Sequence, residues 1–274
     1  MIAIIAGTGN LPLEACKNLR AKGQPFFVVS LFPENNASEL AAVTHGIADV
    51  VAQEFYKPGD VLSLLKKRLA THVLFIGKVD KNNLLKHLKF DWLAIKLMGS
   101  VLRRSDKDIM EALLAELARN NIQTLRQDDV LGGLLVPPGI LTGTLMPELE
   151  NDILVGLEAA QAIAHADIGQ TVVVKDGMIL AVEAIEGTDA CIKRGLEIGK
   201  EKVVICKTAR TDQNKKFDLP TLGPGSLAGF QPGQVAVIAW HAPCTLIAQK
   251  DIFVERAEKL GIVLVARPAI TYTK

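Results

Sequence analysis

The chain has 274 residues, of which 49% are hydrophobic and 22% charged, so it can bury one large or two modest cores and is not disordered. Its 31 lysines and arginines balance 30 aspartates and glutamates, and a net charge of +1 argues against nucleic-acid binding. No apolar run reaches the roughly 18 residues of a membrane-spanning helix. The start lacks the basic region of a signal peptide, and the four cysteines are widely spaced. These features predict a cytoplasmic protein with reduced thiols.

The first half alternates short apolar runs with helical patterns. Strands are predicted at 2–6, 25–31, 73–76 and 122–125, and helices at 13–21, from 58 and from 106, where Ser105 or Asp106 would be the N-cap. Because the strands are continuously apolar, both faces of their sheet should be covered by helices. We therefore expect an N-terminal Rossmann-like domain over residues 1–130, with a parallel sheet.

Glycine and proline are frequent in residues 126–147, which predicts a domain junction there. A helix is expected from 147 to about 166, followed by a hairpin that turns at Asp176 and Gly177. Further strands are expected near 203–206, 235–239, 245–248 and 262–266, and a last helix near 252–260. Residues 131–274 therefore form a second, C-terminal α/β domain with a mixed sheet.

A glycine-rich turn joins the first predicted strand to the first predicted helix. Its residues are Gly7, Thr8, Gly9 and Asn10, and such a turn can present backbone N–H groups to a phosphate or nucleotide. Pro12 stands where the dinucleotide fingerprint has its third glycine, and the second strand is not followed by the acid that binds ribose. A nicotinamide-dependent oxidoreductase is therefore disfavoured. The alternative is a turn without a ligand. Lys78, after the strand at 73–76, could contact a phosphate or be solvated.

Two clusters in the second half suit a magnesium-assisted reaction at phosphates. Glu183, Glu186 and Asp189 follow the hairpin, and Thr188 or Asp189 is the expected N-cap of the next helix. Asp218 stands beside a stiff Pro220 turn, and the cations around it are Lys207, Arg210, Lys215 and Lys216. Carboxylates suit Mg²⁺, and cations suit phosphate. The alternative is that Asp189 and Asp218 only cap a helix and a turn.

The whole chain resembles the LpxI-type UDP-2,3-diacylglucosamine pyrophosphatase family of lipid A synthesis. The most specific segments are Glu186-Gly187-Thr188-Asp189 and Asp218-Leu219-Pro220-Thr221, in this order, with Ile5 to Pro12, Gly77-Lys78-Val79, Leu102 to Asp106 and Asp167 to Gln170 in support. The chain departs from the family pattern at Asn214 and Lys216, where an acid and an arginine are expected.

The resemblance implies Mg²⁺-dependent cleavage of a UDP-linked diacylated glucosamine to UMP and the lipid sugar 1-phosphate. It also implies that Asp218 is the essential acid of the family. Together with the residue pattern above, we expect catalytic roles for Asp218, Asp189, Glu183 and Lys207, magnesium ligation by Asp218, Asp189 and Glu186, and substrate binding by Gly7, Thr8, Gly9, Asn10, Lys78, Gly187, Thr188 and Thr221. An amphiphilic substrate implies transient contact with the inner membrane surface, and a homodimer is left open. The alternative function is a non-catalytic nucleotide- or lipid-binding protein.

Overall fold

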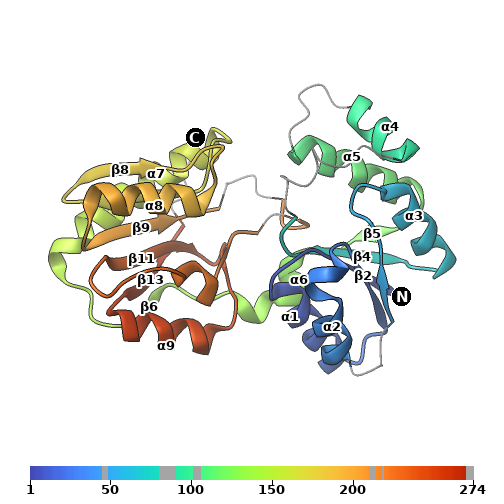
Figure 1. Ribbon diagram of the computed structural model, residues 1–274, viewed down its shortest axis with the longest axis horizontal. Helices are drawn as coiled ribbons and strands as arrows, with labels where there is room; N and C mark the ends of the chain where they lie inside the picture. The colour runs from blue at the N-terminus through green and yellow to red at the C-terminus, as the bar shows by residue number, and fades with distance from the viewer. Residues whose placement is uncertain (45–48, 80–90, 101–105, 210–213, 218, 270–274) are drawn as a thin grey trace. The chain divides into compact units, whose positions relative to one another are not determined.

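The computed structural model describes residues 1–44, 49–79, 91–100, 106–209, 214–217 and 219–269, and it divides into two compact units (Figure 1). Unit 1 comprises Met1–Gly132 together with Lys215–Phe217, and unit 2 comprises Gly133–Asn214 and Asp218–Lys274. The division falls two residues after the predicted boundary. The return of three later residues to unit 1 was not predicted.

Unit 1 is built on a five-stranded parallel sheet. Its strands are β1 (Ile2–Ala6), β2 (Phe26–Ser30), β3 (Val50–Ala52), β4 (His72–Ile76) and β5 (Gln123–Thr124), in the order β3-β2-β1-β4-β5. Every residue of β2 is buried, as its unbroken apolar run predicts. The strand order reverses between β1 and β4, where α/β sheets bind their ligands. The predicted Rossmann-like fold is confirmed.

Helices cover both faces of this sheet. They are α1 (Leu11–Ala21), α2 (Pro33–Thr44), α3 (Pro58–Lys67), α4 (Trp92–Ser100), α5 (Asp106–Arg119) and α6 (Gln127–Leu131). Leu65 of α3 and Leu117 of α5 pack on Ile5 and Val29 of the sheet. Helix α1 begins two residues before its predicted start and holds Pro12 in its first turn as expected. Sequence patterning missed α2, α4, α6 and β3.

Unit 2 carries a mixed sheet, as predicted, and this sheet has six strands, of which β6 (Gly139–Thr142) was not predicted. The others are β7 (Thr171–Lys175), β8 (Met178–Val182), β9 (Val203–Lys207), β11 (Val235–Ala242) and β13 (Val263–Pro268), and the strand order is β6-β13-β11-β9-β7-β8. Strands β9, β11 and β13 are parallel, whereas β6 and β7 run against their neighbours. The carboxyl ends of β8, β9, β11 and β13 therefore share one edge with the start of β7.

Three long helices pack on this sheet: α7 (Glu150–His165), preceded by a 3-10 turn (Pro147–Leu149), α8 (Thr188–Gly199) and α9 (Lys250–Leu260). Ile153 of α7 and Cys191 of α8 belong to separate apolar clusters, and the two helices lie on opposite faces (Figure 1). The strand expected at 245–248 is the short β12 (Leu246–Ile247), which pairs with β10 (Thr221–Leu222) outside the main sheet. Within the described part of the chain, every helix is too short or too polar to span a bilayer.

A stability test follows from how closely α7 lies on the sheet. A Cβ on Gly156 would lie 2.4 Å from Cys206 Sγ, so Gly156→Ala must displace buried atoms. Alanine favours a helix by about 1 kcal/mol over glycine, but overpacking costs about 1–3 kcal/mol. We expect a net loss in the free energy of unfolding, measured by urea denaturation. Gly225→Ala is the control because nothing lies within 4 Å of its added Cβ; an equal effect of both changes would contradict the argument.

Candidate functional site

At the switch point of unit 1, the loops after β1 and β4 are joined by backbone hydrogen bonds. Gly7 N donates to Ile76 O (2.9 Å), Thr8 N donates to Lys78 O (2.8 Å), and Lys78 N donates back to Thr8 O (2.9 Å). These bonds bring the predicted substrate-binding residues of the two loops, Gly7 to Asn10 and Lys78, to one edge of the sheet. They lie where a doubly wound sheet binds a ligand.

The same bonds narrow the prediction that this turn presents backbone N–H groups to an anion. The N–H groups of Gly7 and Thr8 are already bonded to the neighbouring loop. A Cβ on Gly7 would lie 2.4 Å from Lys78 O, so this glycine serves the close approach of two loops. Any phosphate contact therefore falls to Gly9, to Asn10 at the start of α1, and to the exposed Lys78.

Lys78 offers the cleaner test of substrate binding in unit 1. Gly9 has φ +93°, so a valine there would strain the backbone and confuse binding with folding. Lys78→Ala leaves the backbone pairing intact. If the ammonium contacts a phosphate, KM should rise about tenfold, as for a partly exposed charged hydrogen bond. Steady-state kinetics checks this, with Lys66→Ala, another exposed lysine, as the control. An unchanged KM would show that Lys78 does not contact a substrate phosphate.

In unit 2, a buried lysine anchors a polar network at the carboxyl edge of the sheet. Lys207, the last residue of β9, is 8% exposed. Its Nζ donates to Thr171 Oγ1 (3.2 Å) on β7 and to Thr188 Oγ1 (3.1 Å) on α8. Thr171 lies opposite Lys207 in the ladder, because β7 starts where β9 ends. The sheet therefore fixes a positive charge beside the first turn of α8.

A carboxylate completes this network. Thr188 Oγ1 donates to Glu183 Oε1 (2.9 Å), and Gln170 N donates to Glu183 Oε2 (3.2 Å). The structure thus brings together Lys207, Thr188 and Glu183, which the sequence placed in the site. It adds Thr171 and Gln170, which were not predicted as site residues. The sequence could have indicated both residues, since Gln170 ends a segment that resembles the family and Thr171 opens the predicted hairpin.

The first turn of α8 differs from the prediction in its cap. Gly187 is the N-cap, and both Thr188 and Asp189 lie inside the helix. Since the Thr188 hydroxyl bonds to Glu183 and Lys207, it does not cap the backbone. The positive end of the α8 dipole consequently lies beside the Lys207 ammonium, and both favour an anion.

The predicted magnesium ligands do not all fit a metal site. Glu186 forms an ion pair with Arg194 (2.5 Å), and hydrogen bonds from its own backbone and from Arg194 hold its pKa below the usual value. Asp189 is exposed in the first turn of α8 and suits a metal that keeps most of its waters. Asp218 lies outside the described residues. Among those described, no three acid, histidine or cysteine side chains converge on one point.

The surroundings of Asp218 are partly described. Lys215 belongs to unit 1, where its Nζ bonds to Asp128 Oδ2 (3.2 Å) and its carbonyl accepts from Gln127 N (2.6 Å). Lys215 was predicted to bind a substrate phosphate, but its ammonium group forms an ion pair with Asp128. Arg126 and then Lys215 hold the pKa of Asp128 below the usual value. Arg210, another predicted cation, lies outside the described residues.

The hydroxyl of Thr221 makes a hydrogen bond that is not part of the Lys207 network. Thr221 opens β10, and its hydroxyl donates to Leu219 O (3.4 Å). Among the described residues, no hydrogen bond links it to Lys207, Thr188 or Glu183. Its predicted role in substrate binding has therefore no support from these contacts.

Comparison with known proteins settles the family. The model of the LpxI N-terminal domain matches residues 1–134, and that of the LpxI C-terminal domain matches residues 137–265. The chain belongs to the LpxI family. It is 28% identical over 274 residues to the UDP-2,3-diacylglucosamine pyrophosphatase LpxI of Caulobacter vibrioides, covering 95% of each chain. This LpxI-family chain therefore matches that relative along nearly its whole length.

A weaker structural likeness is to a UDP-glucose-4-epimerase from Stenotrophomonas maltophila with bound NAD and formylated UDP-arabinopyranose. The two share 16% identity and a TM-score of 0.31, over 44% of this chain and 34% of that one. That score is too low to support any conclusion about the LpxI-family protein.

Proposed function

We propose that this LpxI-family protein hydrolyses the pyrophosphate bond of UDP-2,3-diacylglucosamine, giving UMP and 2,3-diacylglucosamine 1-phosphate. The name of the Caulobacter relative and the length of the match support this substrate. The observation that carries the chemistry is the buried Lys207 beside the first turn of α8. A fixed cation and a helix N-terminus are the groups that stabilise charge developing on a phosphoryl group.

The network gives each residue a distinct task. The Lys207 ammonium neutralises charge on the phosphate oxygens, and the Thr171 and Thr188 hydroxyls keep it in one position. Glu183 accepts from Thr188 and from the Gln170 backbone, so it orients the Thr188 hydroxyl toward Lys207. Glu183 is therefore a positioning residue in this proposal, and Lys207 is the catalytic one.

We further propose that the reaction needs Mg²⁺, held by Asp189 and Asp218 together with substrate phosphate and water. Mg²⁺ commonly takes only one or two protein carboxylates and completes its shell in this way. The ion would supply additional charge neutralisation at the phosphates when bound. Glu186 is left out of this ligand set because Arg194 already pairs with it.

The proposed activity is tested by incubating the protein with UDP-2,3-diacylglucosamine in detergent micelles and measuring UMP. We expect UMP release with Mg²⁺ and almost none in excess EDTA, with recovery when Mg²⁺ is restored. Full turnover in EDTA would refute the metal requirement. Tight substrate binding without any UMP in Mg²⁺ would favour the alternative, a non-catalytic binding protein of the same architecture.

A further inference from the structure

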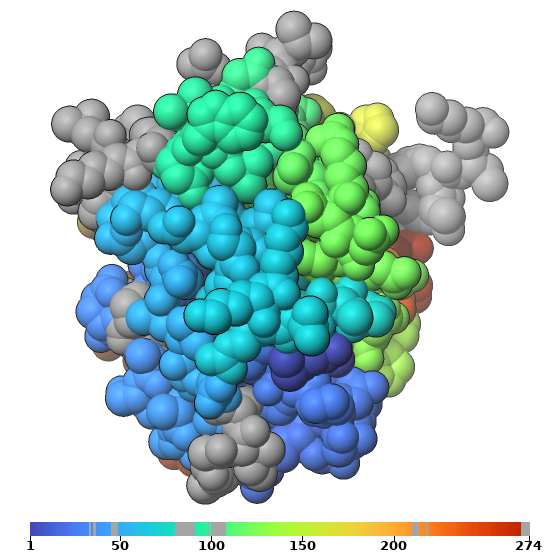
Figure 2. Space-filling model, turned by 90° about the vertical axis from the view of Figure 1, so that its right-hand side faces the viewer, coloured from blue at the N-terminus to red at the C-terminus, as the bar shows by residue number. Residues whose placement is uncertain are grey.

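One helix of unit 1 exposes large apolar side chains on its outer surface. Trp92 is 74% exposed and Ile95 is 57% exposed, both on α4. Trp92, Ile95, Lys96 and Gly99 are all exposed and follow the i, i+3, i+4, i+7 spacing of one helical face. We name these four residues the outer face of α4. In Figure 2 the teal atoms of α4 lie at the surface beside the green atoms of α5.

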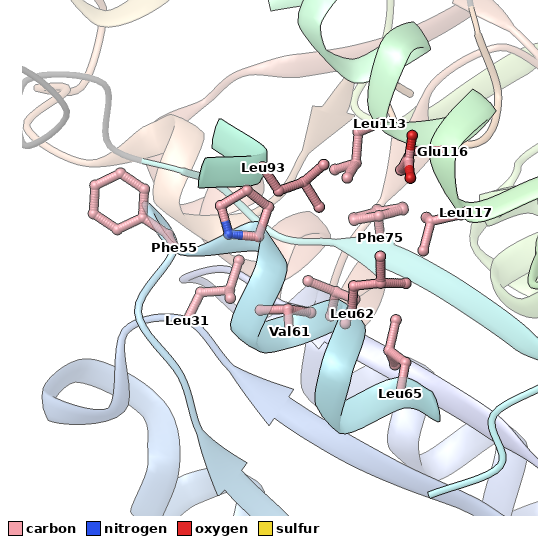
Figure 3. A pocket seen from close by; sticks show the side chains of 12 residues that line it. Leu31, Phe55, Val61, Leu62, Leu65, Phe75, Leu93, Leu113, Glu116 and Leu117 are labelled. Atoms are coloured by element: carbon pink, nitrogen blue, oxygen red, sulfur yellow. The ribbon is translucent and has the colours of Figure 1, made fainter. Parts of the chain in front are cut away.

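The opposite face of α4 is apolar as well. Leu93, Ala94 and Leu97 are buried. Leu93 points into a cavity that Leu62 and Leu113 also line, between α3, α4 and α5 (Figure 3). The cavity encloses about 60 Å³, less than half of the about 150 Å³ that holds benzene, so it is a packing gap. Burying the inner face leaves the apolar outer face without a partner among the described residues of unit 1.

Several contacts hold α4 in this orientation. Asp91 Oδ1 accepts from Ala94 N (2.8 Å), and Asp91 Oδ2 accepts from Gly59 N (2.6 Å) at the start of α3. Lys96 Nζ bonds to Glu116 Oε2 of α5 (3.0 Å). The same Nζ lies 5.6 Å from the centre of the Trp92 ring. Trp92 and Ile95 are therefore presented to the surroundings by a helix anchored at both α3 and α5.

The charges in the sequence around α4 indicate which kind of partner its outer face would bind. Lys96 is the one charged residue in the sequence of α4. In the sequence from 80 to 104, six lysines and arginines stand against two aspartates, although the whole chain carries only +1. An exposed tryptophan, an exposed aliphatic side chain and a basic surrounding sequence are typical of helices that lie at an anionic membrane surface.

We propose that the outer face of α4 docks this protein on an anionic phospholipid bilayer. Trp92 and Ile95 enter the headgroup region. Lys96 shares the Glu116 carboxylate with Arg119, so these three side chains keep one net positive charge, and Lys96 stays at the level of the lipid phosphates. The inference rests on the proposed function, because a diacylated substrate resides in a membrane. It goes further by assigning the membrane contact to four residues of unit 1.

The two tryptophans of the chain make this docking directly observable. Trp92 is exposed, whereas Trp240 is 0% exposed in the core of unit 2. Vesicles of phosphatidylethanolamine and phosphatidylglycerol should shift the fluorescence of the full chain to shorter wavelength, and brominated lipid should quench it. Trp92→Phe should abolish the shift. Vesicles of phosphatidylcholine alone should bind less, and salt should weaken the binding to anionic vesicles.

Vesicle sedimentation with a matched variant tests the surface. Trp92→Gln/Ile95→Gln should lower the lipid partition coefficient about tenfold or more. Ile198→Gln is the control, since Ile198 is 55% exposed on α8, and it should change partitioning less than about twofold. Equal partitioning of wild type and double variant would overturn the proposal. So would a dimer in analytical ultracentrifugation that the double variant converts to monomer, because α4 would then face a second copy.

The micelle assay separates this inference from the proposed function. The double variant should release UMP from micellar substrate at the wild-type rate, because Trp92 and Ile95 lie outside the catalytic network. Activity in micelles without vesicle binding by the wild type would refute the docking surface alone. Vesicle binding without UMP release by the wild type would refute the proposed activity and leave lipid docking standing.

Discussion

Lys207→Met is expected to lower kcat by about 10²–10³, the usual effect of removing one preorganised electrostatic stabiliser of a transition state. Methionine has nearly the length of lysine but no charge, so the space beside Thr171 and Thr188 stays filled while the cation is lost. Lys207→Arg should not restore the rate, because a planar guanidinium does not fit a buried site built for an ammonium. Rates of UMP release and melting temperatures measured on both variants check the prediction.

Lys193→Met provides the control for this experiment. Lys193 is exposed on α8, so its charge is screened and its removal should leave kcat nearly unchanged. A folded Lys207→Met protein with wild-type kcat would show that the lysine only ties β9 to β7 and α8. Loss of rate in proportion to loss of folded protein would lead to the same conclusion.

Asp218→Ala should lower kcat by about 10²–10⁴ while substrate still binds, as expected for a group that positions a metal or an attacking water. The prediction rests on the catalytic role that the family resemblance of Asp218-Leu219-Pro220 implies for Asp218. The two residues that follow it are held in place, since Leu219 is buried and the Pro220 carbonyl accepts from Leu246 N (2.9 Å). Single-turnover kinetics and equilibrium binding separate the loss of rate from any loss of affinity.

An ordinary turn-capping aspartate would give a different result. Its loss would cost about 0.5–2 kcal/mol of stability and leave kcat of the folded fraction unchanged. Asp251→Ala is the matched control, because Asp251 is exposed in the first turn of α9 and far in sequence from the network. Near-normal turnover by folded Asp218→Ala would transfer the acid's role to Asp189 or Glu183.

The strands of both units were predictable because most are continuous apolar runs closed by glycine, proline or a charged residue. The missed elements lack such a pattern. Helix α2 begins at Pro33 with a polar, asparagine-rich turn, and β3 has only three residues. Helix α4 carries apolar side chains on both faces, so its sequence shows no helical periodicity. Glycine and proline mark the segment in which the two units divide, between Gly132 and Gly133.

The site was predictable in residue type more than in contacts. Glu183 and Thr188 are only five residues apart, and Lys207 meets them because β9 pairs with β7 of the hairpin; the sequence indicated both segments separately. The ion pairs of Glu186 with Arg194 and of Lys215 with Asp128 could not be foreseen, since each depends on tertiary packing. The bonded N–H groups of Gly7 and Thr8 likewise depend on the loop after β4.

The return of Lys215–Phe217 to unit 1 has a consequence for synthesis on the ribosome. The first 132 residues can begin to fold as they emerge, but Lys215, which pairs with Asp128 in addition to Arg126, is made later. Phe217 is made 85 residues after Gly132, which at about 5–20 residues per second is a delay of about 4–17 s. During this time the nascent N-terminal unit lacks the contacts that Lys215–Phe217 make with it. A gene fragment that stops after residue 132 would never form these contacts. One that starts at residue 133 would encode Lys215–Phe217 without the unit to which they belong.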